Sequence, residues 1–225
     1  MKYRLGLDIG IASVGWSVIK LNENDEPVRI EDLGVRTFIA AENPKDGSSL
    51  ALPRRIARGV RRRLRRRRYR LNRIIKLFIK NNILQEKEID YILNNKNKNK
   101  SVWHLRSEAL DLLVTNEELF RIIYHICKRR GFKSNRKSDI KQDETGLQLS
   151  AINEINKMLT EKKYRTIGEM FYKDESFKNR KRNTTNDYSN TISRKLLENE
   201  LHLILTTQQK LGNHLLTNDF INHVL

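Results

Sequence analysis

Twelve arginines fall within the twenty positions from Arg54 to Arg73, and no acidic residue lies between Asp46 and Glu86. The window from Arg54 to Lys80 carries +14 of the formal net charge of +18. Solvated helix faces normally interleave acids with bases, so this arginine run repels itself unless a polyanion lies against it. Arginines that neutralise backbone phosphates release condensed counterions, and we therefore expect a nucleic-acid partner.

The arginine run has the features of one long helix. Pro53 suits a first helical turn, and from there to about Ile83 only Gly59 interrupts helix-compatible residues. Such a helix is about 40 Å long. Its apolar residues fall on one narrow stripe, which Arg67 breaks: Ile56, Val60, Leu64, Leu71, Ile74, Ile75 and Phe78. The opposite face carries Arg55, Arg58, Arg62, Arg65, Arg66 and Arg73 with Tyr69 among them, and Arg70 lies at its edge.

The segments on the two sides of this helix have different patterns, which together predict an α+β fold. Residues 2–38 indicate three short antiparallel strands, at 2–9, 14–21 and 33–39, that need a covering layer. Beyond residue 83 the pattern is helical. We predict helices at 86–93, 150–160 and 192–211. A further helix is capped by Thr115 with Glu118 and ended by Gly131. Loops are expected at 94–100 and 138–146.

Several classes of protein are excluded. Cys127 is the single cysteine, so the chain forms no internal disulfide and no cysteine-based zinc cluster. The start of the chain lacks the apolar core of a signal peptide, and no stretch approaches 18 uninterrupted apolar residues. We therefore expect an intracellular protein without a membrane segment.

Asp8 is a candidate metal ligand. It ends the first predicted strand and is followed by Gly10 at a tight turn, where a carboxylate can ligate a hard divalent cation. A strand-end aspartate that only favours the turn explains the pattern equally well. The same D-x-G pattern opens actin-like kinases and ATPases, but the glycine-rich adenosine loop of those proteins is absent from the sequence.

A second basic segment runs from His125 to Lys137. Cations at a helix C-terminus are favoured by the helix dipole, which accounts for Lys128 and its two neighbouring arginines without a ligand. That argument does not cover the cations that continue beyond the glycine. We therefore predict phosphate contacts from Arg129, Arg130, Lys133 and Arg136.

The order of these parts resembles the start of the RNA-guided DNA endonucleases of type II CRISPR systems, the Cas9 family, and most closely its compact type II-C branch. The resemblance is carried by the Asp8 strand, RIEDLGVRTF at 29–38, AENP at 41–44, LALPRR at 50–55, the arginine run, WHLRSEALD at 103–111, KRRGFKSNRK at 128–137 and the region 188–191. It covers nearly the whole sequence.

The resemblance implies three parts. Residues 1–47 are the first segment of a RuvC-like nuclease domain with an RNase H fold, and Asp8 is its first catalytic, metal-binding carboxylate, for Mg²⁺ or Mn²⁺. Residues 48–82 are the arginine-rich bridge helix, and residues 83–225 begin a helical recognition lobe. The RNA contacts of the bridge helix then fall on Arg55, Arg58, Arg62, Arg65, Arg66 and Arg70.

The resemblance also implies a monomer in the cytoplasm of a prokaryotic cell, with guide RNA (crRNA and tracrRNA) and target double-stranded DNA as partners. The sequence lacks the other RuvC segments, the His-Asn-His nuclease domain and the PAM-reading domain of this family. We therefore expect an N-terminal fragment that does not cut DNA alone. The alternative is a non-enzymatic basic RNA-binding protein, although that function does not explain Asp8 and its turn.

Overall fold

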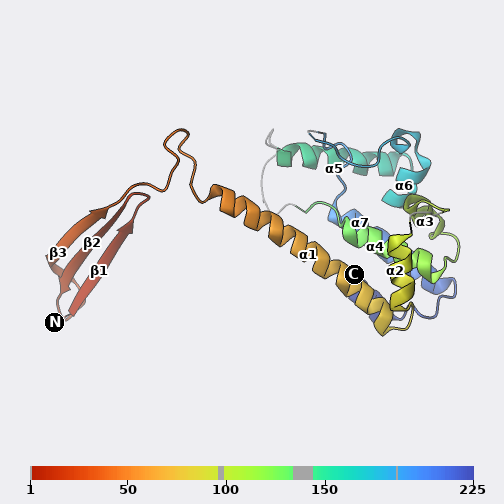
Figure 1. Ribbon diagram of the computed structural model, residues 1–225, viewed down its shortest axis with the longest axis horizontal. Helices are drawn as coiled ribbons and strands as arrows, with labels where there is room; N and C mark the ends of the chain where they lie inside the picture. The colour runs from red at the N-terminus through yellow and green to blue at the C-terminus, as the bar shows by residue number, and fades with distance from the viewer. Residues whose placement is uncertain (1, 96–98, 134–143, 186) are drawn as a thin grey trace. The chain divides into compact units, whose positions relative to one another are not determined.

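The computed structural model describes residues 2–95, 99–133, 144–185 and 187–225, and it confirms a mixture of β-sheet and helices (Figure 1). The chain divides into two compact units, residues 1–64 and 65–225. The first contains the sheet, and the second contains most of the helices. Among the helices that are described, none is long and apolar enough to cross a membrane.

The first unit contains an antiparallel sheet of β1 (Lys2–Ile9), β2 (Ser13–Leu21) and β3 (Pro27–Thr37), in that order. The predicted bounds of the first two strands are confirmed within a residue. The third strand was predicted to start at Leu33, but it starts at Pro27. Irregular pairing at the end of β2 lets the strand begin directly after the turn, where the side chain of Asn22 accepts hydrogen bonds from two backbone amides.

Apolar side chains of this sheet remain accessible. Tyr3, Leu5 and Leu7 of β1 are each more than half exposed, and so is Val35 of β3. Trp16 is half-buried and lies against Gly34, where a Cβ atom would come within 2.7 Å of the indole. The glycine therefore makes room for the largest side chain of the sheet.

The arginine run forms α1 (Leu52–Lys80), a helix of 29 residues and about 43 Å. It begins one residue before the predicted start and ends three residues before the predicted end, close to Asn82, which has a positive φ of 54°. The apolar stripe is buried only in its C-terminal half, at Leu71, Ile74 and Phe78. Ile56 and Leu64, in the N-terminal half, are each 59% exposed.

The main core of the second unit lies where the C-terminal part of α1 meets α2 (Glu86–Asn94), α4 (Asn116–Lys128), α7 (Arg194–Lys210) and α8 (Asn218–Val224). At its centre, Phe78 makes edge-to-face contacts with Phe120 and Phe220, at ring-centroid distances of 5.1 and 5.4 Å. The predicted capping box of Thr115 and Glu118 is present at the start of α4.

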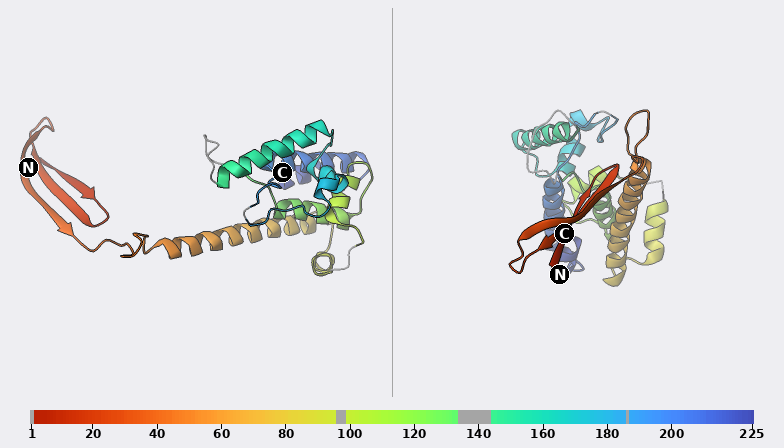
Figure 2. Two further views of the ribbon diagram at one scale, coloured as in Figure 1. Left: turned by 90° about the horizontal axis from the view of Figure 1, so that it is seen from above. Right: turned by 90° about the vertical axis from the view of Figure 1, so that its left-hand side faces the viewer.

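A smaller core joins α3 (Val102–Glu108), α5 (Glu144–Glu161), α6 (Ile167–Lys173) and the 3₁₀ helix η1 (Glu175–Phe177). In both of the wider views, α4 and α7 lie between α5 and the C-terminal part of α1 (Figures 1 and 2). Helices α3, α6 and α8 were not predicted, because seven residues are too few to establish an apolar period. The start of α5 was predicted six residues too late, and most of the loop predicted at 138–146 lies outside the described residues.

Candidate nucleic-acid interface

The arginines on the outer face of α1 are exposed, as the helical phasing predicts. Arg55, Arg58, Arg62, Arg65 and Arg66 all belong to this face, which we call the arginine face. Among the described residues, the ion pairs formed by carboxylates all involve other cations. The arginine face therefore presents guanidinium groups with no internal counter-charge in the described part of the chain, and a phosphate backbone suits it.

Arg70 differs from the other predicted RNA contacts. It is half-buried, and its Nε donates a hydrogen bond of 2.7 Å to the backbone oxygen of Cys127 near the C-terminus of α4. Burial, together with the nearby charges of Arg130 and Arg67, lowers the pKa of Arg70. This hydrogen bond joins α1 to α4. It is favourable because carbonyls at a helix C-terminus carry partial negative charge. Arg70 therefore has a structural role, whatever else it binds.

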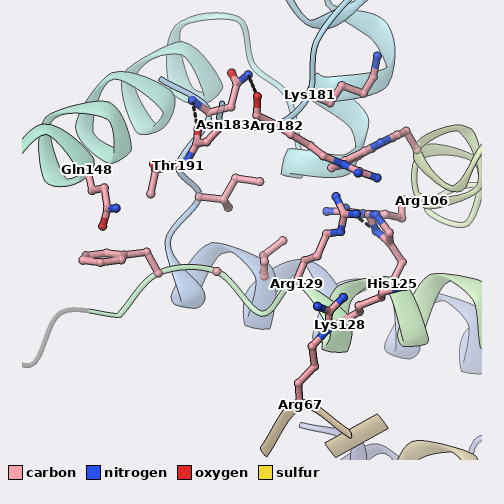
Figure 3. A pocket seen from close by; sticks show the side chains of 16 residues that line it. Arg67, Arg106, His125, Lys128, Arg129, Gln148, Lys181, Arg182, Asn183 and Thr191 are labelled. Atoms are coloured by element: carbon pink, nitrogen blue, oxygen red, sulfur yellow. Dashed lines mark hydrogen bonds between the residues drawn. The ribbon is translucent and has the colours of Figure 1, made fainter. Parts of the chain in front are cut away.

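A cavity of about 490 Å³ in the second unit gathers cations from several elements (Figure 3). We call it the basic cavity. It is lined by Arg67, Trp103, Arg106, His125, Lys128, Arg129, Gly131, Phe132, Gln148, Lys181, Arg182, Asn183, Asn190, Thr191, Ile192 and Leu197. None of these described residues is acidic. Its walls come from α1, α3, α4, α5 and α7, and from the segment that precedes α7.

One side of the basic cavity is built around a buried ion pair. Arg106 of α3 donates from Nε and Nη2 to the two carboxylate oxygens of Glu200 in α7, at 2.6 and 2.7 Å. The backbone amide of Gly168 also donates to Glu200, at 3.0 Å. A Cβ atom at Gly168 would lie 2.4 Å from this carboxylate, so the close approach of α6 requires glycine. Arg106 is thus neutralised, and it forms a fixed part of the cavity wall.

Two backbone hydrogen bonds hold the end of α4 against the segment before α7. The amide of Phe132 donates to the oxygen of Ile192 at 2.8 Å, and the amide of Arg194 donates to the oxygen of Phe132 at 2.9 Å. Gly131 has a positive φ of 75°, and a Cβ atom there would lie 2.8 Å from the backbone of Ser193. The glycine predicted as a helix stop therefore also allows two segments, distant in sequence, to form one wall.

The cationic groups of the basic cavity are close enough to affect one another. Arg106, Arg129 and Arg182 converge beside His125, whereas Gln148 and Thr191 lie on the other side (Figure 3). Burial, and then the charges of Arg182 and Arg67, lower the pKa of Arg129. Burial, and then the charge of Arg106, lower the pKa of His125 to about 3, so this imidazole is neutral at pH 7.

The predicted residues of the second basic segment have different positions. Arg129 lines the basic cavity, whereas Arg130 and Lys133 are exposed outside it, and Arg136 lies outside the described residues. Sequence reasoning missed Arg182, whose only signal is its place in the basic run Arg180–Arg182. Arg67 left a clearer signal, because it interrupted the apolar stripe of the arginine-rich helix.

Asp8 lies at the end of β1 with an exposed side chain, and its cross-strand neighbour is Gly15. Among the described residues, no group of three or more His, Cys, Asp or Glu side chains could hold a metal ion. A single carboxylate does not form the two-metal site of a nuclease. The described residues therefore do not fit a complete Mg²⁺ site, and the role predicted for Asp8 requires ligands from outside them.

Comparison with known proteins identifies relatives, although no family model matches the chain. The chain is 39% identical over 221 residues, or 92% of its length, to the CRISPR-associated endonuclease Cas9 of Campylobacter jejuni. It is 29% identical over 98% of its length to the Cas9 1 endonuclease of Streptococcus thermophilus. It spans 21% and 19% of the lengths of these relatives.

Solved structures give the same result. The crystal structure of Campylobacter jejuni Cas9 with sgRNA and target DNA matches all of this chain, with a TM-score of 0.65 and 33% identity, and the match covers 29% of that structure. A complex of St1Cas9 with sgRNA matches 99% of this chain and 24% of the St1Cas9 chain, with a TM-score of 0.62 and 26% identity. Over nearly all of its length, the chain is homologous to the CRISPR-associated endonuclease Cas9.

Proposed function

We propose that the chain is the guide-RNA-binding N-terminal part of an RNA-guided DNA endonuclease of CRISPR defence, and that the arginine face binds the RNA backbone. The observation that carries the proposal is the row of exposed arginines along α1 without internal counter-charges in the described residues. Its spacing on one side of a rigid helix suits a run of phosphates rather than a single anion. Homology to proteins solved with sgRNA and target DNA supports both partners.

The proposal divides the chain as the resemblance implies. Residues 1–47 are a first RuvC-like segment, 48–82 the bridge helix and 83–225 the start of a recognition lobe. The observed order supports this division, because a three-stranded sheet is followed by one long basic helix and then by shorter helices. In this scheme the chain alone binds RNA but does not cleave DNA, since the described residues lack a complete metal site.

RNA binding is tested by titrating the chain with a labelled structured CRISPR-repeat RNA at several salt concentrations. Changing Arg58, Arg62 and Arg65 together to Gln should weaken binding and lower the slope of log K against log [salt] by about two to three, roughly one per lost phosphate contact. The control changes Lys157 and Lys210, exposed cations on other helices, to Gln. An unchanged slope in the triple variant contradicts the role of the arginine face.

The same titration with an unrelated RNA distinguishes the alternative function. Equal affinity for the two RNAs at every salt concentration favours a generic RNA-binding protein over a guide-RNA carrier. A preference for the repeat RNA supports the proposal. Sequence-independent phosphate contacts alone cannot produce such a preference.

Asp8 is tested separately, because its role belongs to cleavage. Asp8→Ala should leave RNA affinity unchanged in this chain. In a longer protein that contains the chain together with the remaining nuclease segments, the same change should abolish nicking of the non-target strand. Unaltered nicking in that protein would contradict the proposed metal ligand.

A further inference from the structure

Most of the positive charge in the basic cavity is not offset by any carboxylate of the described residues. Arg106 is neutralised by Glu200, but Arg67, Lys128, Arg129 and Arg182 form no ion pair with a carboxylate of a described residue. The C-terminal dipole of α4 favours cations in its last turn, which accounts for Lys128 and Arg129. It does not account for Arg67 or Arg182, which come from other segments. Such a concentration of like charge favours an anion in the cavity.

The two sides of the basic cavity differ in chemistry. The guanidinium groups of Arg129 and Arg182 converge on one side, and Gln148 lies on the other (Figure 3). Phe132 and Asn190 also line the cavity. A volume of about 490 Å³ falls in the range of cavities that enclose a small ligand, roughly 300–1,000 Å³. One nucleotide has the matching polarity, because its phosphate is anionic and its base offers hydrogen bonds and an aromatic face.

We propose that the basic cavity holds one unpaired nucleotide of the bound RNA, with its phosphate between Arg129 and Arg182 and its base toward Phe132 and Gln148. The inference rests on the proposed function, since it assigns part of the same RNA to a second site. The two sites use different geometry. The arginine face contacts successive phosphates along an exposed helix, whereas the cavity encloses a single group.

The fold prepares this site in two ways. The Arg106–Glu200 ion pair fixes one wall without adding net charge, and the backbone hydrogen bond from Phe132 to Ile192 fixes another. Guanidinium groups suit the phosphate because their planar fork donates two parallel hydrogen bonds. An aromatic ring suits the base because stacking accepts any base and adds affinity without a charge.

Two variants test the phosphate end. Arg182 is exposed, and its side chain forms no ion pair with a described carboxylate, so Arg182→Gln should fold normally. It is expected to weaken binding of the structured CRISPR-repeat RNA about tenfold. The double variant Arg129→Gln with Arg182→Gln should weaken binding further. It should also lower the salt slope by about one, because both arginines contact the same phosphate. The matched control with the same loss of charge is Lys157→Gln with Lys210→Gln.

Phe132→Leu tests the base end. This change removes an aromatic face but no charge, so RNA affinity should fall while the salt slope stays the same. Unchanged affinity in Phe132→Leu would overturn the placement of the base.

The emission of Trp103 gives a direct readout of the cavity. The chain has two tryptophans, so Trp16→Phe leaves Trp103, which lines the cavity, as the single reporter. Its emission should change as the RNA binds, with the same midpoint as the labelled RNA. In the Trp16→Phe background, the double arginine variant should show no emission change even when saturated with RNA.

The outcomes separate this inference from the proposed function. Absence of RNA binding by the wild-type chain would refute both. Only the nucleotide site is wrong if the arginine-face variant loses RNA affinity while the cavity variants bind RNA as tightly as the lysine control and the Trp103 emission does not change. An emission change that persists in the saturated double variant also overturns it.

Discussion

Removal of Arg106 should strongly destabilise the second unit. The side chains of Arg106 and Glu200 are 2% and 0% exposed, so Arg106→Met leaves a buried carboxylate whose remaining partner is the Gly168 amide. Breaking a buried ion pair on one side costs about 3–5 kcal/mol. That is a large part of the about 5–15 kcal/mol by which a domain is normally stable.

Urea denaturation followed by Trp103 emission in the Trp16→Phe background measures this effect. Trp103 is a suitable reporter because the Arg106 guanidinium lies 4.4 Å from its ring centroid. With a slope of about 2 kcal/mol per molar urea, a loss of about 4 kcal/mol moves the midpoint down by about 2 M.

The cost of the unpaired Glu200 charge can be measured separately. Adding Glu200→Gln to Arg106→Met removes the unpaired charge and keeps an acceptor for Gly168. The double variant should therefore recover about 2 kcal/mol or more. Lys178→Met is the control, because its ion pair with Glu175 is exposed and is worth less than about 1 kcal/mol. The reasoning is refuted if Arg106→Met behaves like the control, or if the second substitution restores nothing.

Gly131→Ala should lower the urea midpoint, because its Cβ would lie 2.8 Å from backbone atoms, whereas Gly59→Ala in open space should raise stability by about 0.5–1 kcal/mol. Burial disfavours the ionised form of Glu169, but hydrogen bonds from Arg165 and a neighbouring lysine outweigh it and lower the pKa of this carboxyl to about 2. The wild-type urea midpoint should therefore fall as pH drops from about 4.5 toward 2, and it should fall less in Glu169→Gln. Burial raises the pKa of the Cys127 thiol to about 11, so iodoacetamide should modify Cys127 at pH 8 only after unfolding.

Local patterns predicted much of this fold. The arginine run gave one long helix because its residues favour a helix without interruption, and the capping box of Thr115 identified the start of α4. Strand alternation located β1 and β2. These features depend on neighbours within a few residues, and such neighbours can be read directly from the sequence. The predictions failed where a short element is stabilised by distant contacts, as in α3, α6 and α8, and where β3 continues through irregular pairing.

The functional surfaces divide in the same way. The sequence alone determined the arginine face, because helical phasing is enough to place Arg58 and Arg62 on one exposed side. The basic cavity required the tertiary structure, since its walls come from residues more than a hundred positions apart, such as Arg67 and Arg182. The sequence predicted Arg70 as a phosphate contact, and only the structure revealed its bond to α4. Local periodicity determines which face of a helix is charged, but only chain packing decides which charges share a cavity and which are neutralised.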